Sequence, residues 1–470
     1  MNITGTRRRA LIAGLAVAML ALAGCGGGDS GGEQGGQGGS ITVWTLEDNA
    51  ERVKIQQDIV ARFQQEKGIT VKLVPVNEDQ FATLMTNASA AGDVPDAIGS
   101  LSLGLVNKLA VDEISDPEAA NAVIEALGRD TFSERALKLV EVNGQPVSVP
   151  SDGWTQLLVY RKDLFDKAGL APPDSYDAIK AAAAKLNTGG VSGIVAATKP
   201  GDTFTQQTFE HIALANGCQL TDDAGNVTLT SSQCVGAFGF YDDLIKNYSA
   251  KGAQDVDSTR ATYFAGRSAM LVWSSFILDE LAGLRNDALP TCDECKDSSD
   301  FLAKNSGIVT GFKGPNGTEP AQYGEISGWA LTRDGKGDKE ATKTFVQYMM
   351  NEAYVDWLGM APEGKFPVRT GTADDKQKFT TAWDGLQAGV DTKKPLSEVY
   401  PAEVLDVLRG SVNTFNRWGF PQGQGRLVGA QLAELPIPKA LAAALNGTLD
   451  PAAAANQAQA DLEEIAQSIS

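Results

Sequence analysis

Five of the seven tryptophans in this 470-residue chain stand beside polar side chains at the ends of predicted strands. Aromatic rings cover apolar C–H faces, and carboxylates, hydroxyls and guanidinium groups form directional hydrogen bonds with hydroxyl groups. Hydrogen bonds to ionised acceptors are the stronger kind, about 1.5–3 kcal/mol each. The combination is typical of a site for a polyhydroxylated molecule. The candidates are Trp44 with Glu47 and Asp48, Trp154 with Asp152, Trp273 with Ser274, Trp418 with Arg417, and Trp329 after Ser327.

Several of these candidates have a purely structural explanation as well. Glu47 and Asp48 stand where a helix would begin, and carboxylates there bind free amide N–H groups. Asp96, a further candidate acid, could equally end its strand, and Arg369 could equally form a structural ion pair. Asp152, just after a proline and before a glycine, is the acid most strongly expected to contact a ligand.

The composition excludes several kinds of function. A single His in the whole chain disfavours His-based catalysis and multi-His metal sites, since the usual proton carrier at neutral pH is almost absent. With 59 acidic against 40 basic residues, the formal net charge is −19, and such a chain repels nucleic acid. We expect no cofactor, no metal and no nucleic-acid partner.

The N-terminus predicts export. Three arginines at positions 7–9 precede fourteen uncharged residues at 10–23, a run too short to span a bilayer. Leu22-Ala23-Gly24-Cys25 resembles the bacterial lipobox, in which the cysteine is acylated, so we predict a signal peptide at 1–24 and lipidation of Cys25. Cleavage leaves a net charge of −22 and a Gly-rich tether at 25–40. We therefore expect the protein to be exported by the Sec or the Tat route and to be lipid-anchored to the outside of the cell membrane.

Four cysteines remain after Cys25, and outside the cytoplasm an even number favours disulfides. Residues 219–229 read as a hairpin whose ends lie close together, so Cys218–Cys234 with Cys292–Cys295 is the preferred pairing. A zinc site built from the four thiols is the rival interpretation, but only Cys292 and Cys295 have the C-x-x-C spacing.

Hydropathy patterns predict the elements that position these residues. Alternation at 41–44, 69–74 and 94–98 predicts three strands, and two helices carry apolar residues at helical spacing between them, the first ended by Gly68. Such an order predicts a mostly parallel sheet with helices on both faces. Its ligand crevice lies beyond the carboxyl ends of the strands.

The chain contains AAGDVPD at 90–96, VP at 149–150 with YRKDLFDKAGL at 160–170, FAGRSAM at 264–270 followed by Trp273, FPVR at 366–369, and LNG at 445–447. In this order, these segments resemble the family 1 extracellular solute-binding proteins, the carbohydrate-binding lipoproteins of ABC importers. Together they cover essentially the whole chain beyond the tether, and their order carries the match. Tyr176, where the family usually has Trp, and the Cys292–Cys295 insertion depart from the pattern.

The resemblance implies a two-lobed α/β fold of the type II periplasmic-binding-protein kind. Each lobe would be a mostly parallel sheet flanked by helices, and crossing hinge strands would join the two. It places the first lobe at 41–150 plus 325–365 and the second at 151–324 plus 366–470. It also implies ligand-contacting aromatics at Trp154 and Trp273.

The sequence thus favours a sugar-binding receptor without catalytic residues. It would act as a monomer, close on a mono- or oligosaccharide by hinge motion and deliver it to the transmembrane subunits of an ABC permease. One alternative is a secreted glycoside hydrolase, which needs two carboxylates about 5–10 Å apart. Another is the same fold with a peptide, a polyamine or a sugar phosphate as its ligand.

Overall fold

The computed structural model describes residues 39–469, and its main element is one mixed sheet of eight strands. Six strands follow the order β10–β6–β9–β3–β1–β2, while β7 and β8 both pair with β6. The strands are β1 (Ser40–Thr45), β2 (Thr70–Pro75), β3 (Ala97–Leu101), β6 (Val149–Arg161), β7 (Met270–Ser274), β8 (Ser306–Val309), β9 (Gly324–Leu331) and β10 (Phe366–Pro367). Two small hairpins, β4 (Glu141–Val142) with β5 (Gln145–Pro146) and β11 (Gln387–Ala388) with β12 (Lys394–Pro395), complete the strands of this part of the chain.

The first lobe, which we define by β1–β3 with the helices packed on them, contains the predicted parallel unit. β1 pairs in parallel with both β2 and β3. α1 begins because the Asn49 side chain accepts the amides of Glu51 and Arg52, and it ends at Gly68 in the left-handed conformation. The helices of this lobe are α1 (Ala50–Lys67), α2 (Glu78–Ala91), α3 (Leu103–Val111), α4 (Pro117–Leu127), α5 (Glu134–Leu139), α13 (Lys339–Met349) and α14 (Tyr354–Leu358).

The third predicted strand is displaced along the chain. It was expected at 94–98, but β3 begins at Ala97. Pro95 has no amide to donate to a ladder, and the Asp96 carboxylate accepts the amides of Thr42, at 2.7 Å, and Gly337, at 2.6 Å. Asp96 therefore ties the entry to β3 against β1 and the loop that follows β9.

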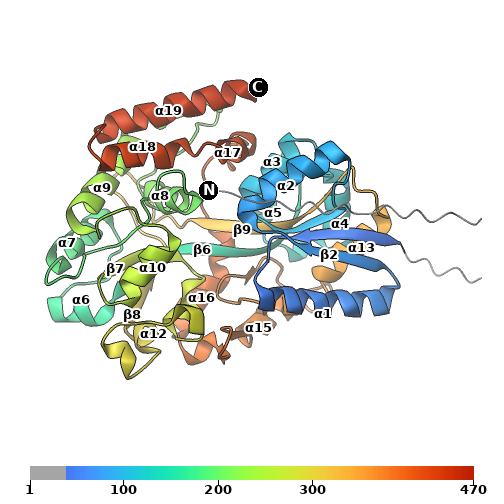
Figure 1. Cartoon of the computed structure of the whole chain (residues 1–470), viewed down its shortest axis with the longest axis horizontal. Coiled ribbons are helices and arrows are strands. Elements are labelled where there is room, and N and C mark those ends of the chain that lie inside the picture. The colour runs from blue at the N-terminus through green and yellow to red at the C-terminus, as the bar shows by residue number, and fades with distance from the viewer. Residues whose placement is uncertain (1–38, 470) are drawn as a thin grey trace, which may run out of the picture. The chain divides into compact units, whose positions relative to one another are not determined.

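β6 and β9 cross the middle of the described part (Figure 1), and the two-residue strand β10 pairs with β6. β6 is thirteen residues long; its first half pairs with β9 and β10, and its second half pairs with β7 and β8. β9 lies between β6 and β3 and so joins the two parts of the sheet. The lobe boundaries predicted at 150, 324 and 365 fall at or next to the starts of these three strands, and they stay a prediction.

The second lobe, which we define by β7, β8 and the helices around them, lies on the other side of β6 in Figure 1. Its sheet differs from the prediction, because β7 and β8 run antiparallel to β6 and the sheet as a whole is mixed. The cause is that β6 enters this lobe directly from the first, without a crossover helix. The helices here are α6 (Lys162–Ala168), α7 (Tyr176–Leu186), α8 (Thr203–Ala215), α9 (Ser232–Tyr248), α10 (Val256–Phe264), α11 (Ile277–Leu281) and α12 (Phe301–Asn305).

The C-terminal helices follow β10. α17 packs on α3 of the first lobe, whereas α18 and α19 pack on α9 of the second. These helices are α15 (Lys378–Asp384), α16 (Ala402–Gly410), α17 (Gly425–Gln431), α18 (Pro436–Leu445) and α19 (Pro451–Ser468). Short 3₁₀ turns lie at Arg129–Thr131, Asn286–Ala288, Glu294–Lys296, Leu396–Glu398 and Ser411–Asn413.

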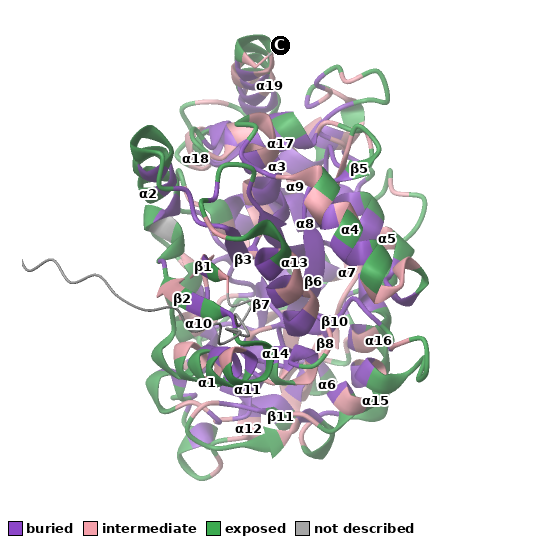
Figure 2. Ribbon diagram, turned by 90° about the vertical axis from the view of Figure 1, so that its right-hand side faces the viewer, coloured by how far each residue is buried: buried purple, intermediate pink, exposed green. Residues whose placement is uncertain are grey.

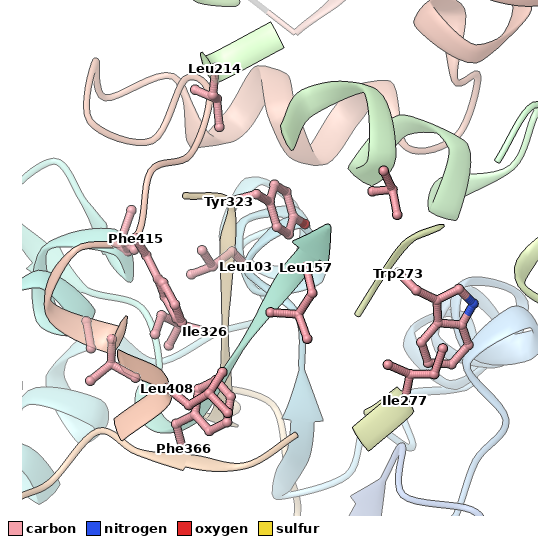
Figure 3. Close-up of a cluster of buried hydrophobic side chains, with 14 of the residues drawn as sticks. Leu103, Leu157, Leu214, Trp273, Ile277, Tyr323, Ile326, Phe366, Leu408 and Phe415 are labelled. Carbon is pink, nitrogen blue, oxygen red and sulfur yellow. The ribbon is translucent and has the colours of Figure 1, made fainter. Parts of the chain in front are cut away.

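The crossing strands are buried, while the outer faces of helices such as α1 and α2 are exposed (Figure 2). Phe415 packs beside Tyr323 and Ile326 in the core under β6 and β9 (Figure 3). Its ring occupies the space where a Cβ on Gly324 would lie, 1.9 Å from Phe415 Cγ, so only glycine fits at that position of β9.

The four cysteines form two close pairs. The sulfurs of Cys218 and Cys234 lie at disulfide-bonding distance, and so do those of Cys292 and Cys295. The Cα atoms are 4.6 Å apart in the first pair and 4.9 Å apart in the second. The pairs match the preferred pairing rather than a four-thiol zinc site. The expected hairpin between the first two is reduced to one antiparallel bridge, Thr221–Val227.

The predicted signal peptide, Cys25 and all but the last two residues of the predicted tether lie outside the described residues. Within 39–469, none of the helices has the length and apolar character needed to cross a bilayer.

Candidate ligand-binding site

A cavity of about 290 Å³ lies between the lobes, at the ends of strands from both. Its walls combine three aromatic rings with four carboxylates, two cations and several hydroxyls, the composition expected for a polyhydroxylated ligand. The first lobe and the crossing strands supply Leu46, Glu47, Arg52, Glu78, Ser100, Ser102, Asp152, Trp154, Glu325, Ser327 and Lys365, and the second lobe supplies Phe204, Gln207, Val256, Ser274 and Phe276.

Lys365 is the centre of the polar wall. It is 1% exposed, and its Nζ lies 2.5 Å from Glu47 Oε1 and 3.5 Å from Asp152 Oδ2. The ammonium group also lies over the ring of Trp357, 4.4 Å from the ring centroid. One buried cation thus connects the end of β1 to β6, and this fixes two carboxylates relative to each other.

Glu47 is held in its ionised form. Its carboxylate accepts from Arg52 Nη1 at 2.8 Å and from Ser100 Oγ at 3.0 Å, in addition to Lys365. Burial alone would raise its pKa, but the charges and hydrogen bonds of Lys365 and Arg52 outweigh burial and hold the pKa of Glu47 well below its usual value.

Ser100 reaches Glu47 because of a bulge in β3. Between Ile98 and Leu101 the register against β9 shifts, and Ser100 adopts φ 62°, in the left-handed region. A non-glycine residue in this conformation is strained, and such strain is concentrated at functional sites. The bulge aims the hydroxyl at the carboxylate.

Asp152 is oriented by three neighbours. Its Oδ1 accepts from Ser151 Oγ at 2.7 Å and from Trp357 Nε1 at 2.6 Å, while Oδ2 faces Lys365. A carboxylate offers about four acceptor positions, so capacity remains for one further donor.

The aromatic walls come from Trp154, Phe204 and Phe276. Trp154 and Phe276 meet edge to face with centroids 6.3 Å apart, and the Arg52 guanidinium lies 5.3 Å from the Phe276 centroid. Phe276 also rests on Gly364, where a Cβ would lie 2.2 Å from the ring. Phe204 stands edge to face with Trp273, 5.9 Å away.

Glu325 forms the opposite polar wall. Its Oε1 accepts the amide of Leu103 at 2.8 Å, and its Oε2 binds Arg417 at 2.6 Å. Arg417 in turn binds Glu210 on α8, at 3.0 Å. This chain of contacts connects α3 of the first lobe to α8 of the second.

Asp279 interacts electrostatically with both Glu280 and Glu363, so these buried acids form a cluster. Burial raises the pKa of Asp279 to about 6 and that of Glu280 to about 7, in spite of nearby arginines, and it raises the pKa of Glu363 well above its usual value. None of these three acids lines the cavity among the described residues.

Of the predicted site residues, Glu47, Asp152, Trp154 and Ser274 line the cavity. Trp273 lies behind Phe204 and donates its indole N–H to Val256 O at 3.0 Å. Trp44 packs against the small core of the first lobe, and Asp48 is exposed and accepts from Asn77 at 3.0 Å.

The remaining candidates are buried elsewhere. Trp329 packs between Phe345 and Trp357, and Trp418 donates to Cys218 O at 3.0 Å. Arg369 donates to Thr131 Oγ1 and to the carbonyls of Leu127 and Met350, and burial lowers its pKa to about 10. Asp96 holds the entry to β3, as described above.

Sequence reasoning did not include Arg52, Phe204, Phe276, Glu325 or Lys365 in the site. A usable signal existed for two of them. Phe276 comes two residues after the end of β7, and Lys365 immediately precedes a predicted crossing segment.

A larger cavity, about 410 Å³, lies between α2 and α3. Its walls are mainly apolar, with Phe81, Met85, Leu109 and Ile114 among them. Such walls offer few partners for hydroxyl groups, so the cavity between the lobes is the better candidate site.

The two-lobed α/β fold is the predicted one, and together with the cavity between the lobes it defines a class, that of the two-lobed binding proteins. The chain belongs to the family described as bacterial extracellular solute-binding protein, whose family model matches residues 49–356. Members of this class bind small-molecule solutes outside the cytoplasm and present them to ABC permeases.

Relatives and solved structures agree with this assignment. YcjN of Escherichia coli (strain K12), whose name assigns it to the periplasmic-binding proteins of ABC transporters, is 28% identical over 405 residues, 83% of this chain and 86% of that protein. The GacH receptor of Streptomyces glaucescens, solved unliganded and with acarbose, superimposes with a TM-score of 0.68 at 19% identity, over 91% of this chain and 98% of that one. A sugar transporter of Arthrobacter chlorophenolicus with bound laminaribiose gives a TM-score of 0.69 at 17% identity, over 91% and 99%. At these identities the two structures show the fold.

Proposed function

We propose that this protein is the sugar-binding receptor of an ABC importer and captures a mono- or oligosaccharide between its lobes. The observation that carries the proposal is the cavity itself, in which Trp154, Phe204 and Phe276 provide flat apolar walls beside the fixed carboxylates of Glu47 and Asp152. Aromatic rings suit the C–H faces of a sugar, and carboxylates suit its hydroxyls. The sugars bound by the structurally similar proteins support this ligand class.

The cavity does not favour glycoside hydrolysis. A general acid must hold a proton near neutral pH, so its pKa must be raised. Glu47 has the opposite property, because Lys365 and Arg52 hold its pKa low. Glu325 is tied to Arg417 and to the amide of Leu103. We therefore propose binding without turnover.

The same proposal includes closure of the two lobes around the ligand. The first lobe would comprise residues 41–150 plus 325–365, and the second 151–324 plus 366–470. Asp152 and Trp154 lie on β6 where it passes from one lobe to the other. A ligand that contacts both residues would bias the angle between the lobes.

The proposal extends to the maturation of the chain. The N-terminal sequence supports export, removal of residues 1–24 and acylation of Cys25, and the close cysteine pairs support two disulfides. We propose further that the protein acts as a monomer. Substitution Cys25→Ser should move the protein from the membrane fraction to the soluble extracytoplasmic fraction. Its retention at the membrane would contradict lipid anchoring.

Isothermal titration calorimetry against a panel of mono- and oligosaccharides, with product analysis after long incubation, tests the function. We expect binding of at least one sugar, no products, and loss of affinity in Trp154→Ala and Asp152→Asn with unchanged circular dichroism. As a matched control, Trp383→Ala changes a tryptophan of α15 that does not line the cavity. Release of shorter sugars, or wild-type affinity in both site variants, would contradict the proposal.

A further inference from the structure

Both cations that line the described cavity are already bound by carboxylates. Lys365 contacts Glu47 and Asp152, and Arg52 contacts Glu47 at 2.8 Å while its guanidinium lies over the ring of Phe276. Lys365 is 1% exposed. An anionic ligand would have to break one of these ion pairs to obtain a counter-charge, which leaves a carboxylate buried and unpaired.

A third positive feature, the N-terminus of α3, is also occupied. A helix N-terminus attracts anions because its first amides lack partners within the helix. Ser102 precedes α3 on the cavity wall, but its side chain makes no capping hydrogen bond. The carboxylate of Glu325 takes that position instead, at 2.8 Å from Leu103 N, and Arg417 binds its other oxygen.

Glu325 therefore stands where a phosphate or carboxylate of a ligand would find its best partners, a helix N-terminus and an arginine. It is 2% exposed and comes from β9, a crossing strand, so it cannot swing aside without disturbing the hinge. Removing its charge would leave the α3 amide at the cavity wall without an anionic partner, and would leave Arg417 with one carboxylate partner, Glu210, instead of two.

The lining as a whole is acidic. Four carboxylates, Glu47, Glu78, Asp152 and Glu325, face two cations, Arg52 and Lys365. Glu47, Asp152 and Glu325 each accept from three donors, so about one acceptor position remains on each for a ligand O–H or N–H. The cavity offers acceptors and no uncommitted cation.

From these contacts we infer that the cleft selects saccharides without negative charge, neutral or amino-bearing, and rejects sugar phosphates and uronic acids, with Glu325 as the residue that enforces this selection. The inference deepens the proposed function and rests on it for the ligand class. It removes the sugar phosphate from the alternatives that the sequence leaves open.

Glu325→Gln tests the inference, because the amide keeps the size of the side chain and removes the charge. Glu319→Gln, an exposed glutamate that does not line the cavity, is the matched control. Inorganic phosphate is the probe, measured by thermal shift and calorimetry against chloride at equal ionic strength. We expect at most weak phosphate binding in the wild type and in Glu319→Gln, and an affinity at least about tenfold above that level in Glu325→Gln, the size of one charge-assisted contact. Equal phosphate binding by all three proteins would overturn the inference.

A second arm uses the wild type alone, so it does not depend on the folding of the variant. The disaccharide that binds best in the sugar panel is compared with its uronic-acid and amino derivatives. We expect at least tenfold weaker binding of the uronic acid and no loss for the amine. Equal or tighter binding of the uronic acid would overturn charge selection and leave the receptor function intact. If no sugar of any charge binds, the receptor function fails, and the phosphate arm still decides whether the cleft rejects anions.

Discussion

Replacing Lys365 by methionine gives the most direct test of the polar wall. The substitution keeps a long unbranched side chain over Trp357 and removes the only cation that contacts Asp152 among the described residues. The side chains of Lys365 and Asp152 are each 1% exposed, so water replaces the lost partner only in part, from the side of the cavity. Removing one member of a buried ion pair costs about 3–5 kcal/mol, because the other charge stays buried without compensation.

The assay is scanning calorimetry at pH 7. For a chain of this length the unfolding entropy is about 0.9 kcal/mol/K, so the expected fall in Tm is about 3–6 °C. Lys304→Met is the matched control, since its ion pair with Asp300 is at the surface, with Lys304 63% exposed, and should contribute no more than about 1 kcal/mol.

The loss should also depend on pH with a defined sign. Because the folded-state pKa of Glu47 lies below its unfolded value of 4.5, its ion pairs stabilise the fold above that pH, and the stabilisation is lost as the pH falls. The effect of Lys365→Met should therefore be largest near pH 7 and shrink below about pH 4.5. Addition of Asp152→Asn should recover part of the loss, because it removes the stranded charge. A Tm within 1 °C of the wild type, or a double variant that loses the sum of both single effects, would refute the role given to Lys365.

Three further predictions concern other parts of the molecule. Replacing Cys234 by serine opens a loop with a sequence separation of 16 and should lower the free energy of unfolding by about 3 kcal/mol. Replacing Cys292, whose pair is separated by 3, should lower it by about 2 kcal/mol. Calorimetry with and without reductant measures both losses, and equal Tm values in all cases would contradict the prediction. The raised pKa of Glu280, about 7 against 4.5 when unfolded, means that the fold favours the protonated form, so stability should fall as the pH rises through this window, by about 3 kcal/mol from this group. Urea unfolding across pH 4–8 should show a flatter profile for Glu280→Gln, and an unchanged slope would speak against the assignment. Gly364→Ala should displace the aromatic ring that rests on it and weaken sugar binding with little change in Tm, whereas Gly410→Ala, with open space around its Cβ, should leave binding unchanged.

The sequence was sufficient to predict β1, β2 and α1 because their signals are local, whereas the third strand was placed three residues too early. Alternation marks β1 and β2, Asn49 caps α1 and Gly68 ends it. The parallel pairing in the first lobe follows from the order of these elements. The antiparallel half of the sheet could not be predicted in this way, because it depends on β6 running unbroken through both lobes.

The site was predicted less completely, for reasons of geometry. Alternation along β7 places Trp273 and Ser274 on opposite sides, and the sequence does not say which side faces the cavity. The place of Lys365 next to a predicted crossing segment does not reveal its partner, because Asp152 lies 213 positions away in the chain. The roles of Glu325 and Arg417 likewise could not be predicted, because they depend on β9 lying next to the N-terminus of α3.

The position of Asp152 on β6 has a consequence for how ligand preference can change. The residue pairs with Ser327 on β9 and with Pro367 on β10, and its carboxylate faces the cavity. A substitution at Asp152 changes both ligand binding and the packing of the crossing strands, so neither property can change at this position without the other. Phe204 and Gln207 lie on α8 of the second lobe and carry no such double constraint. New specificities in evolution or in directed libraries should therefore accumulate on α8, while β6 changes slowly.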